Sequence, residues 1–416
     1  MFIAPAFLSQ ADLNHDGQLS KDEFTALARK WFANWDTNKA NKLDEAKIRE
    51  GLNASLGGPR MFGGPPGGGP GGWGPGMNLQ GAEGKRNGVA AMVGIEFEYV
   101  HADLEFGGQV FKDVGVRYKG NGTFMESRNS LKRSLKVELD RNVKGQSLEG
   151  VTKLNFHNNV TDASWMNEVL SFRLYRDAGV PAPRTAYARV FVTVPGKFDN
   201  QYFGLYSFVE DVDRSFLEQN FGTKRGALFK PVTPTLFADL GDDWRKYKQT
   251  YDPKTRLFEE QTSQMIHFCR LVTTGSDAEF AKAVGQFIDL EEFARFMAVM
   301  VWLSDIDGIL GPGQNFYLYL HPKTQLLEFI PWDQDHSFGQ FPMRGTQEER
   351  EQLSILHPWE NENHFLERVF QIEAFKRLYL AALAEFSHPF SWSSSAEATA
   401  RTCVVASSLL ARLSKS

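Results

Sequence analysis

A stretch rich in glycine and proline divides this chain between residues 57 and 76. Eleven of the twenty residues are glycine, five are proline, and Arg60 carries the only charge. Such a segment cannot bury enough apolar surface to offset the entropy lost on ordering. No Lys-Ser or Lys-Thr pair follows it, so a phosphate-binding loop is not indicated. We therefore predict a flexible linker over residues 55–88, between a small unit (1–54) and a large one (89–416).

The composition of the whole chain excludes several classes of protein. The 416 residues are 42% hydrophobic and 23% charged, which is typical of a folded protein with two or three domains. A formal net charge of −5 offers no basic surface for nucleic acid. Cys269 and Cys403 are the only cysteines, so neither a disulfide framework nor a cysteine zinc site is indicated.

The sequence also bears on location. The longest apolar run, residues 296–303, is far shorter than a membrane span, so we expect none. Residues 1–8 are too short for a signal peptide and lack its basic start. A leader preceding residue 1 would favour an extracellular or cell-surface location, and otherwise the cytoplasm is expected.

Residues 12–23 match the twelve-residue calcium loop of an EF-hand. Gly17 stands where this loop turns sharply. Oxygen ligands stand at the required positions: the side chains of Asp12, Asn14, Asp16 and Glu23, the backbone carbonyl of Gln18, and Ser20 through water. The alternative is an Asx-rich turn that only starts a helix. We predict that this loop binds Ca²⁺.

A second loop, residues 36–47, repeats the pattern in a damaged form. Ala40 lacks a ligand oxygen, Asn41 replaces the turn glycine, and Lys47 replaces the bidentate acid. A cation at the last position opposes metal binding. We interpret the two loops as an EF-hand pair with one competent site, in a small all-α unit.

The large unit shows strand patterns first and helical patterns later. Strands are predicted at residues 114–119, 134–140, 152–156, 187–194 and 201–209, the last two pairing through the turn at 195–200. Asp162 is predicted to cap a helix that carries Met166, Val169, Leu170 and Leu174 on one face and ends at Gly179. Further helices are predicted at 258–272, 290–303, 365–386 and 396–413, interrupted by a hairpin of 315–320 with 326–331. This order predicts a two-lobed α+β fold.

Two groups of acidic residues flank the predicted hairpin. Asp305, Asp307 and Asn315 follow an apolar helix, and Asp333 and Asp335 follow a strand. The hairpin can bring them together. Carboxylates and an amide gathered in this way suit an oxygen-seeking metal and phosphoryl transfer. Taken singly, Asp307 before Gly308 fits a turn and Asp333 fits a loop cap.

A glycine turn offers a second chemical signal. Lys119 begins the sequence Lys-Gly-Asn-Gly between two predicted strands, and Lys132 and Lys136 follow. Backbone N–H groups and lysines of this kind can bind phosphates. A simple hairpin turn with solvated lysines is the alternative.

Together these motifs resemble the CotH kinase family, relatives of the bacterial spore-coat protein H with an atypical protein-kinase-like fold. The resemblance extends over about residues 94–341 and rests on the motifs at 119–122, 131–136, 162–168, 202–210, 315–319 and 332–335. It implies ATP- and Mg²⁺- or Mn²⁺-dependent phosphorylation of Ser or Thr in a protein substrate, such as a surface or coat protein. The expected fold is an α+β, atypical protein-kinase-like two-lobed domain preceded by the EF-hand unit.

The resemblance also assigns roles by position. It implies Asp307 as catalytic acid, Asp333 as the acid of the kinase Asp-Phe-Gly element, and Asp335 and Asn315 as further metal ligands. For the nucleotide it implies Lys119, Lys132 and Lys136 near the phosphates, Glu168 as helix partner of a lysine, and Glu210 at the hinge.

One departure keeps a rival hypothesis open. The family's usual Arg-Gly-Asn-Ser is here Lys119-Gly-Asn-Gly122. The rival is a non-catalytic surface or spore-coat-type protein that uses the fold for adhesion or assembly. Hydrolase or nuclease chemistry on the same acids is disfavoured, because the resemblance extends over most of the large unit.

The linker yields a testable prediction. Twenty Gly-rich residues span roughly 25 Å root-mean-square, so the two units should fold independently. Deleting residues 1–82 should leave the thermal unfolding of the large unit and its phosphate transfer nearly unchanged. A truncated chain that fails to fold, or that folds without activity, would contradict this prediction.

Overall fold

The computed structural model describes residues 11–12, 14, 16, 18–44, 47–48, 51, 55, 88–92, 94–233, 235–341, 346–359 and 362–386. The chain divides into two units, Met1–Met77 and Asn78–Ser416. The glycine-rich stretch at 57–76 and the predicted helix at 396–413 lie outside the described residues. No described helix is long and apolar enough to cross a bilayer.

In the first unit, one long helix stands at the EF-hand position. It is α2 (Lys21–Trp35), and it begins with a capping box. The hydroxyl of Ser20 accepts a hydrogen bond from the N–H of Glu23, whose carboxylate accepts one from the N–H of Ser20. Its apolar face buries Leu27 and Trp31.

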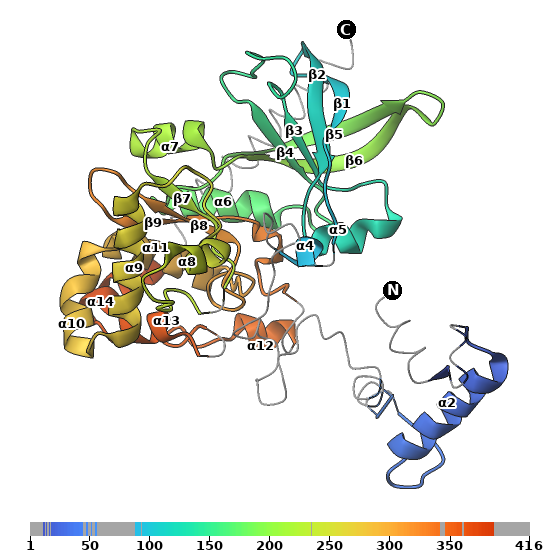
Figure 1. The fold of residues 1–416 in the computed structure, drawn as a ribbon. Helices are drawn as coiled ribbons and strands as arrows, with labels where there is room; N and C mark the ends of the chain where they lie inside the picture. The colour runs from blue at the N-terminus through green and yellow to red at the C-terminus, as the bar shows by residue number, and fades with distance from the viewer. Residues whose placement is uncertain are drawn as a thin grey trace. The chain divides into compact units, whose positions relative to one another are not determined.

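In the second unit, a curled antiparallel sheet comes first (Figure 1). Its strands are β1 (Val100–Phe106), β2 (Gln109–Tyr118), β3 (Leu135–Glu138), β4 (Lys153–His157), β5 (Thr185–Val194) and β6 (Phe198–Glu210). They lie in the order β1-β2-β3-β4-β6-β5. The predicted hairpin of β5 and β6 is confirmed, with Val194 opposite Phe198. Strand β1 is an addition to the strands predicted from the sequence.

The region between β2 and β3 differs from the prediction. The sequence predicted a glycine turn there, either a phosphate-binding turn or a simple hairpin turn, but α5 (Gly122–Glu126) and η1 (Ser127–Asn129) connect the two strands. Glycine is still required at position 120 for a structural reason, because its φ is +102° and a Cβ would lie 2.5 Å from the hydroxyl of Thr123. A further short helix, α4 (Val89–Met92), precedes the sheet.

Between β4 and β5 lies α6 (Asn167–Asp177), which begins later than predicted. Asp162 is not its N-cap. Instead the Asp162 carboxylate accepts hydrogen bonds from the N–H groups of Ser164 and Asn167, both at 2.8 Å, and so organises the turn before the helix. Met166 is 44% exposed rather than on the buried face, while Val169 is buried as expected. Gly179 follows with a φ of +80°.

The remaining elements are mostly helical. Helices are α7 (Arg214–Phe221), α8 (Trp244–Tyr251), α9 (Glu259–Thr274), α10 (Asp277–Ala283), η2 (Val284–Gln286), α11 (Leu290–Trp302), η3 (Gln334–His336), α12 (Gln347–Glu351), α13 (His364–Val369) and α14 (Glu373–Phe386). A second antiparallel sheet joins β7 (Ala227–Phe229), β8 (Phe316–Leu320) and β9 (Leu327–Pro331) in that order. The predicted β8–β9 hairpin is confirmed, and β7 is an addition.

Where one helix was predicted over residues 365–386, there are two. The break between α13 and α14 brings Phe365 and Phe375 against the same ring, that of Phe293 on α11. Their centroids lie 5.5 and 5.6 Å from its centroid, and the ring of Phe329 lies at 4.4 Å. The continuous helical periodicity was therefore overridden by aromatic packing.

Phe293 should accordingly be a strong determinant of stability. It is fully buried, so Phe293→Ala should lower the free energy of unfolding by about 3–5 kcal/mol. Phe258→Ala removes a side chain that is 61% exposed and should change it by no more than about 0.5 kcal/mol. Denaturant unfolding of the large unit measures both. Similar losses in the two variants would show that burial at Phe293 is not the cause.

Candidate functional site

A pocket of about 790 Å³ lies between the first sheet and the ends of β7, β8 and β9. Five of the residues predicted to form the site line it: Lys119, Lys136, Glu168, Asp333 and Asp335. Lys136 comes from β3, and Lys119 follows β2. Segments far apart in the sequence thus meet in one cavity.

The acidic side of the pocket is fixed by the turn after β9. The N–H of Trp332 donates to the carbonyl of Asn315 at 3.0 Å, so the end of β9 lies beside the start of β8. Asp333 then adopts a left-handed backbone with a φ of +54°, a conformation that aspartate tolerates better than most residues. Asp335 accepts a hydrogen bond from the hydroxyl of Thr161. Burial and the Asp333 charge raise its pKa well above the usual value.

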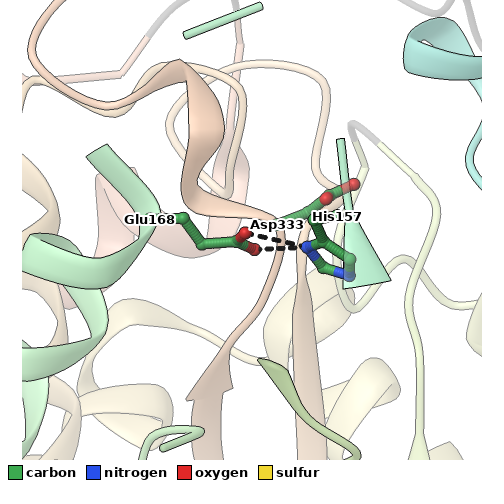
Figure 2. Close-up of side chains that lie close together, drawn as sticks. All are labelled: His157, Glu168 and Asp333. Carbon is green, nitrogen blue, oxygen red and sulfur yellow. Dashed lines mark hydrogen bonds and ion pairs between the residues drawn. The ribbon is translucent and has the colours of Figure 1, made fainter. Parts of the chain in front are cut away.

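Glu168, near the start of α6, faces a histidine in the pocket. Both of its carboxylate oxygens lie 2.8 Å from Nδ1 of His157, and Figure 2 shows Asp333 beside this pair. One ligand atom from each of these three residues lies within 4.8 Å of the others, which is compact enough for a metal ion. On the other side of the imidazole ring, the ammonium of Lys119 contacts Nε2. A chain of contacts therefore runs from Lys119 through His157 to Glu168.

Burial shifts the pKa values of these three side chains. Burial raises the pKa of Glu168 well above its usual value, and the Asp333 charge adds to this effect. Burial lowers the pKa of His157 well below its usual value. Burial also lowers the pKa of Lys119 to about 7, although the Asp333 charge opposes the change. Burial thus disfavours the charged form of all three groups.

Asp307 and Asn315 form a second buried pair. Nδ2 of Asn315 donates to the Asp307 carboxylate at 2.9 Å, and Nε2 of Gln314 donates to its other oxygen at 2.9 Å. Burial, followed by the charge of Asp305, raises the pKa of Asp307 well above its usual value. The charges of Asp335 and Asp333 act in the same direction, so this pair lies within electrostatic reach of the pocket.

The loop that carries Asp307 is tightly closed. A Cβ on Gly311 would lie 2.2 Å from the carbonyl oxygen of Ile306, so only glycine fits there. The N–H of Gly339 donates to the carbonyl of Ser304 at 3.3 Å, which joins this loop to the chain after η3. The expectation that the hairpin gathers the two acidic groups agrees with this arrangement.

Two of the predicted nucleotide-binding residues lie outside the pocket lining. The ammonium of Lys132 lies 4.4 Å from the ring centroid of Trp165. Glu210 forms an ion pair with Arg184 at 2.6 Å. The next residue, Asp211, directly follows β6 and lines the pocket instead.

Several polar residues of the pocket were missed by sequence reasoning, among them Asn155, His157, Asp211 and Lys230. On β4, Leu154 and Phe156 enter the core of the first sheet, while Asn155 and His157 alternate with them and face the pocket. That alternation of apolar and polar residues was a readable signal. Nothing local marks Lys230, which follows a strand of three residues.

In the first unit, the predicted calcium loop is organised by its own acids. The N–H of Asp16 donates to Oδ1 of Asn14 at 3.0 Å and to Oδ1 of Asp12 at 3.2 Å. The N–H of Gln18 donates to Asp16 at 2.8 Å. These side-chain-to-backbone bonds form the tight turns of the first half-loop. Gly17 lies outside the described residues.

The second loop holds its own cation. Nζ of Lys47 donates to Oδ1 of Asn38 at 2.7 Å, at the positions of two ligands in a competent loop. The Asp36 carboxylate accepts from the N–H groups of Ala40 and Asn41, both at 2.8 Å. Asn41 has a φ of +54° where a calcium loop has glycine. The loop therefore closes without a metal ligand at position 47.

Comparison with known proteins gives these geometries a context. The sequence profile of the CotH kinase protein family matches residues 116–399, and an EF-hand profile matches residues 5–28. The chain is also 26% identical, over 232 residues, to the inner spore coat protein H of Bacillus subtilis (strain 168). That alignment covers 55% of this chain and 59% of the relative, so the chain spans less than two thirds of the relative's length. The predicted resemblance is confirmed: this chain belongs to the CotH kinase family and carries an N-terminal EF-hand.

Proposed function

We propose that this protein is an atypical kinase that transfers the γ-phosphate of ATP to a Ser or Thr hydroxyl of a protein substrate, and that its EF-hand unit binds Ca²⁺. One observation carries the kinase proposal. Lysines and carboxylates that lie far apart in the sequence line one pocket, with the Asp307–Asn315 pair within electrostatic reach of it. Family membership adds the expectation of an atypical protein kinase, and of its two-lobed fold.

The donor set fits Mg²⁺ or Mn²⁺ with ATP. Carboxylate and amide oxygens are the ligands that these ions prefer, and Asp333, Asp335 and Asn315 would provide them. Burial leaves Asp335 and Glu168 with raised pKa values, so a nearby cation would favour their charged forms. When bound, the metal would neutralise charge on the phosphates.

Asp307 is suited to the proton transfer. Gln314 and Asn315 hold its two oxygens, which fixes the orientation of the carboxylate. Its raised pKa makes it a better proton acceptor than an ordinary aspartate. We assign it the role of orienting the acceptor hydroxyl and taking its proton as the hydroxyl oxygen attacks the γ-phosphorus and ADP leaves.

The relative's name bears on the substrate class and also on the competing hypothesis of a non-catalytic protein. Because that relative is a spore coat protein, a coat or surface protein is the substrate class we favour here. The same name keeps open a non-catalytic structural role. The rival requires neither nucleotide binding nor transfer, so both can be measured to decide between the two.

Three variants test the assigned roles. Asp307→Asn should leave metal-dependent ATP binding intact while transfer falls by about two or more orders of magnitude. Asp333→Asn should weaken ATP binding and transfer together, because it removes a metal ligand. Asp305→Asn is the matched control: Asp305 is buried outside the pocket lining, so this variant should retain ATP binding and lose far less transfer than Asp307→Asn, although loss of the Asp305 charge lowers the pKa of Asp307. ATP calorimetry with Mg²⁺ or Mn²⁺ and phosphate transfer to a protein panel measure the outcomes. Wild-type transfer in both the Asp307 and Asp333 variants would contradict the kinase proposal.

Calcium binding should occur at one loop only. Calorimetry on the full chain should find one dominant site, which Glu23→Gln abolishes because it removes a charged bidentate ligand. Lys47→Gln is the control and should create no second strong site, since Ala40 still lacks an oxygen. Two equal sites in the wild type, or an unchanged site in Glu23→Gln, would refute the assignment.

A further inference from the structure

The lysines of the pocket fall into two classes by their partners. Three are paired with carboxylates. Nζ of Lys136 lies 3.0 Å and that of Lys153 3.9 Å from Asp211, and Nζ of Lys254 lies 2.5 Å from Asp252. Lys119 and Lys230 have no carboxylate within salt-bridge distance among the described residues. The Asp333 charge attracts both ammonium groups, but among the described residues neither group forms an ion pair with it, so these two positions favour a further anionic ligand.

The position of Lys230 is fixed by the fold. It directly follows the buried strand β7, and its N–H donates to the carbonyl of Tyr251 at 2.9 Å. Its ammonium lies 5.6 Å from the ring centroid of Tyr317. Burial lowers its pKa to about 8, against the opposing charge of Asp333, as expected for a desolvated ammonium.

Trp332 connects the two unpaired lysines. The ammonium of Lys119 lies 5.0 Å from the centroid of this indole ring, and that of Lys230 lies 5.7 Å from it. A tryptophan face attracts cations, so the ring helps to hold the two like charges near each other. The next residue is Asp333, so the two ammonium groups lie beside the proposed metal ligand.

We propose that Lys119 and Lys230, placed on opposite sides of the pocket and both held against Trp332, form the pair that binds the phosphate chain of the nucleotide. This inference rests on the proposed kinase function and makes it specific. Lys136, which Asp211 already neutralises, then maintains the pocket wall, and Lys132 lies outside it. Lys230 becomes a nucleotide-binding residue contributed by the second sheet.

Calorimetry of the full chain with ATP, ADP, AMP and adenosine, in the presence of Mg²⁺, tests the pair. Lys230→Met should weaken ATP binding by about tenfold or more, the scale of a lost charge-assisted hydrogen bond. The effect should shrink as phosphates are removed and vanish for adenosine. Lys119→Met should behave in the same way. Lys254→Met, which removes a paired lysine of the same pocket, should change ATP affinity less than about twofold, and Lys230→Arg should retain most of it.

The outcomes separate this inference from the function on which it rests. A wild-type chain that binds none of the nucleotides would overturn the kinase proposal itself. Wild-type binding of ATP together with unchanged affinity in Lys230→Met would overturn the lysine pair alone. An equal loss for adenosine and ATP would also overturn it, because damage to the pocket rather than loss of charge would be the cause. If Lys230→Met does not fold, the Lys230→Gln and Lys230→Arg variants replace that comparison.

Discussion

Buried hydrogen bonds between α6 and the chain after β9 fix the two sides of the pocket relative to each other. Nδ2 of Asn167 donates to the carbonyls of Asp335 and Ser337 at 3.0 and 3.3 Å, and the hydroxyl of Ser171 bonds that of Ser337 at 2.9 Å. Each of these groups is buried, and a buried polar group left without its partner costs about 1–3 kcal/mol. The contacts fix the side of the pocket that carries Asp333 relative to the helix that carries Glu168.

The polarity of the pocket follows from this arrangement. Lys119 and Lys136 come from the first sheet, and Lys230 and Asp333 come from the ends of the second. Neither sheet alone could gather these charges. A ligand that bears many negative charges and carries a divalent metal would satisfy both sides at once, which is the reason we propose a nucleotide for this pocket rather than a neutral ligand.

Local sequence patterns predicted part of this architecture and failed where distant contacts decide. The β5–β6 and β8–β9 hairpins could be predicted because turn residues and alternation lie within a few positions. The break between α13 and α14 could not be predicted from local patterns, because it depends on packing against Phe293, some seventy residues earlier. The sequence left open which lysine contacts the nucleotide, because that too depends on distant contacts. Lys132 lies over Trp165, and only the fold reveals that Lys230 reaches the ring of Trp332. The acids were predicted because both groups sit at the ends of recognisable elements.

The ammonium of Lys47 has a consequence for how the first unit could report calcium. In a pair of competent loops, binding at one can promote binding at the other, and occupancy then rises steeply over a narrow range of concentration. Here the second loop already contains the ammonium group of its own lysine, hydrogen-bonded to Asn38. Because this cation is part of the chain, its presence in the loop cannot change with the calcium concentration. If the first loop binds calcium, its occupancy follows a simple hyperbola. The unit would then give a graded reading of calcium rather than an abrupt one.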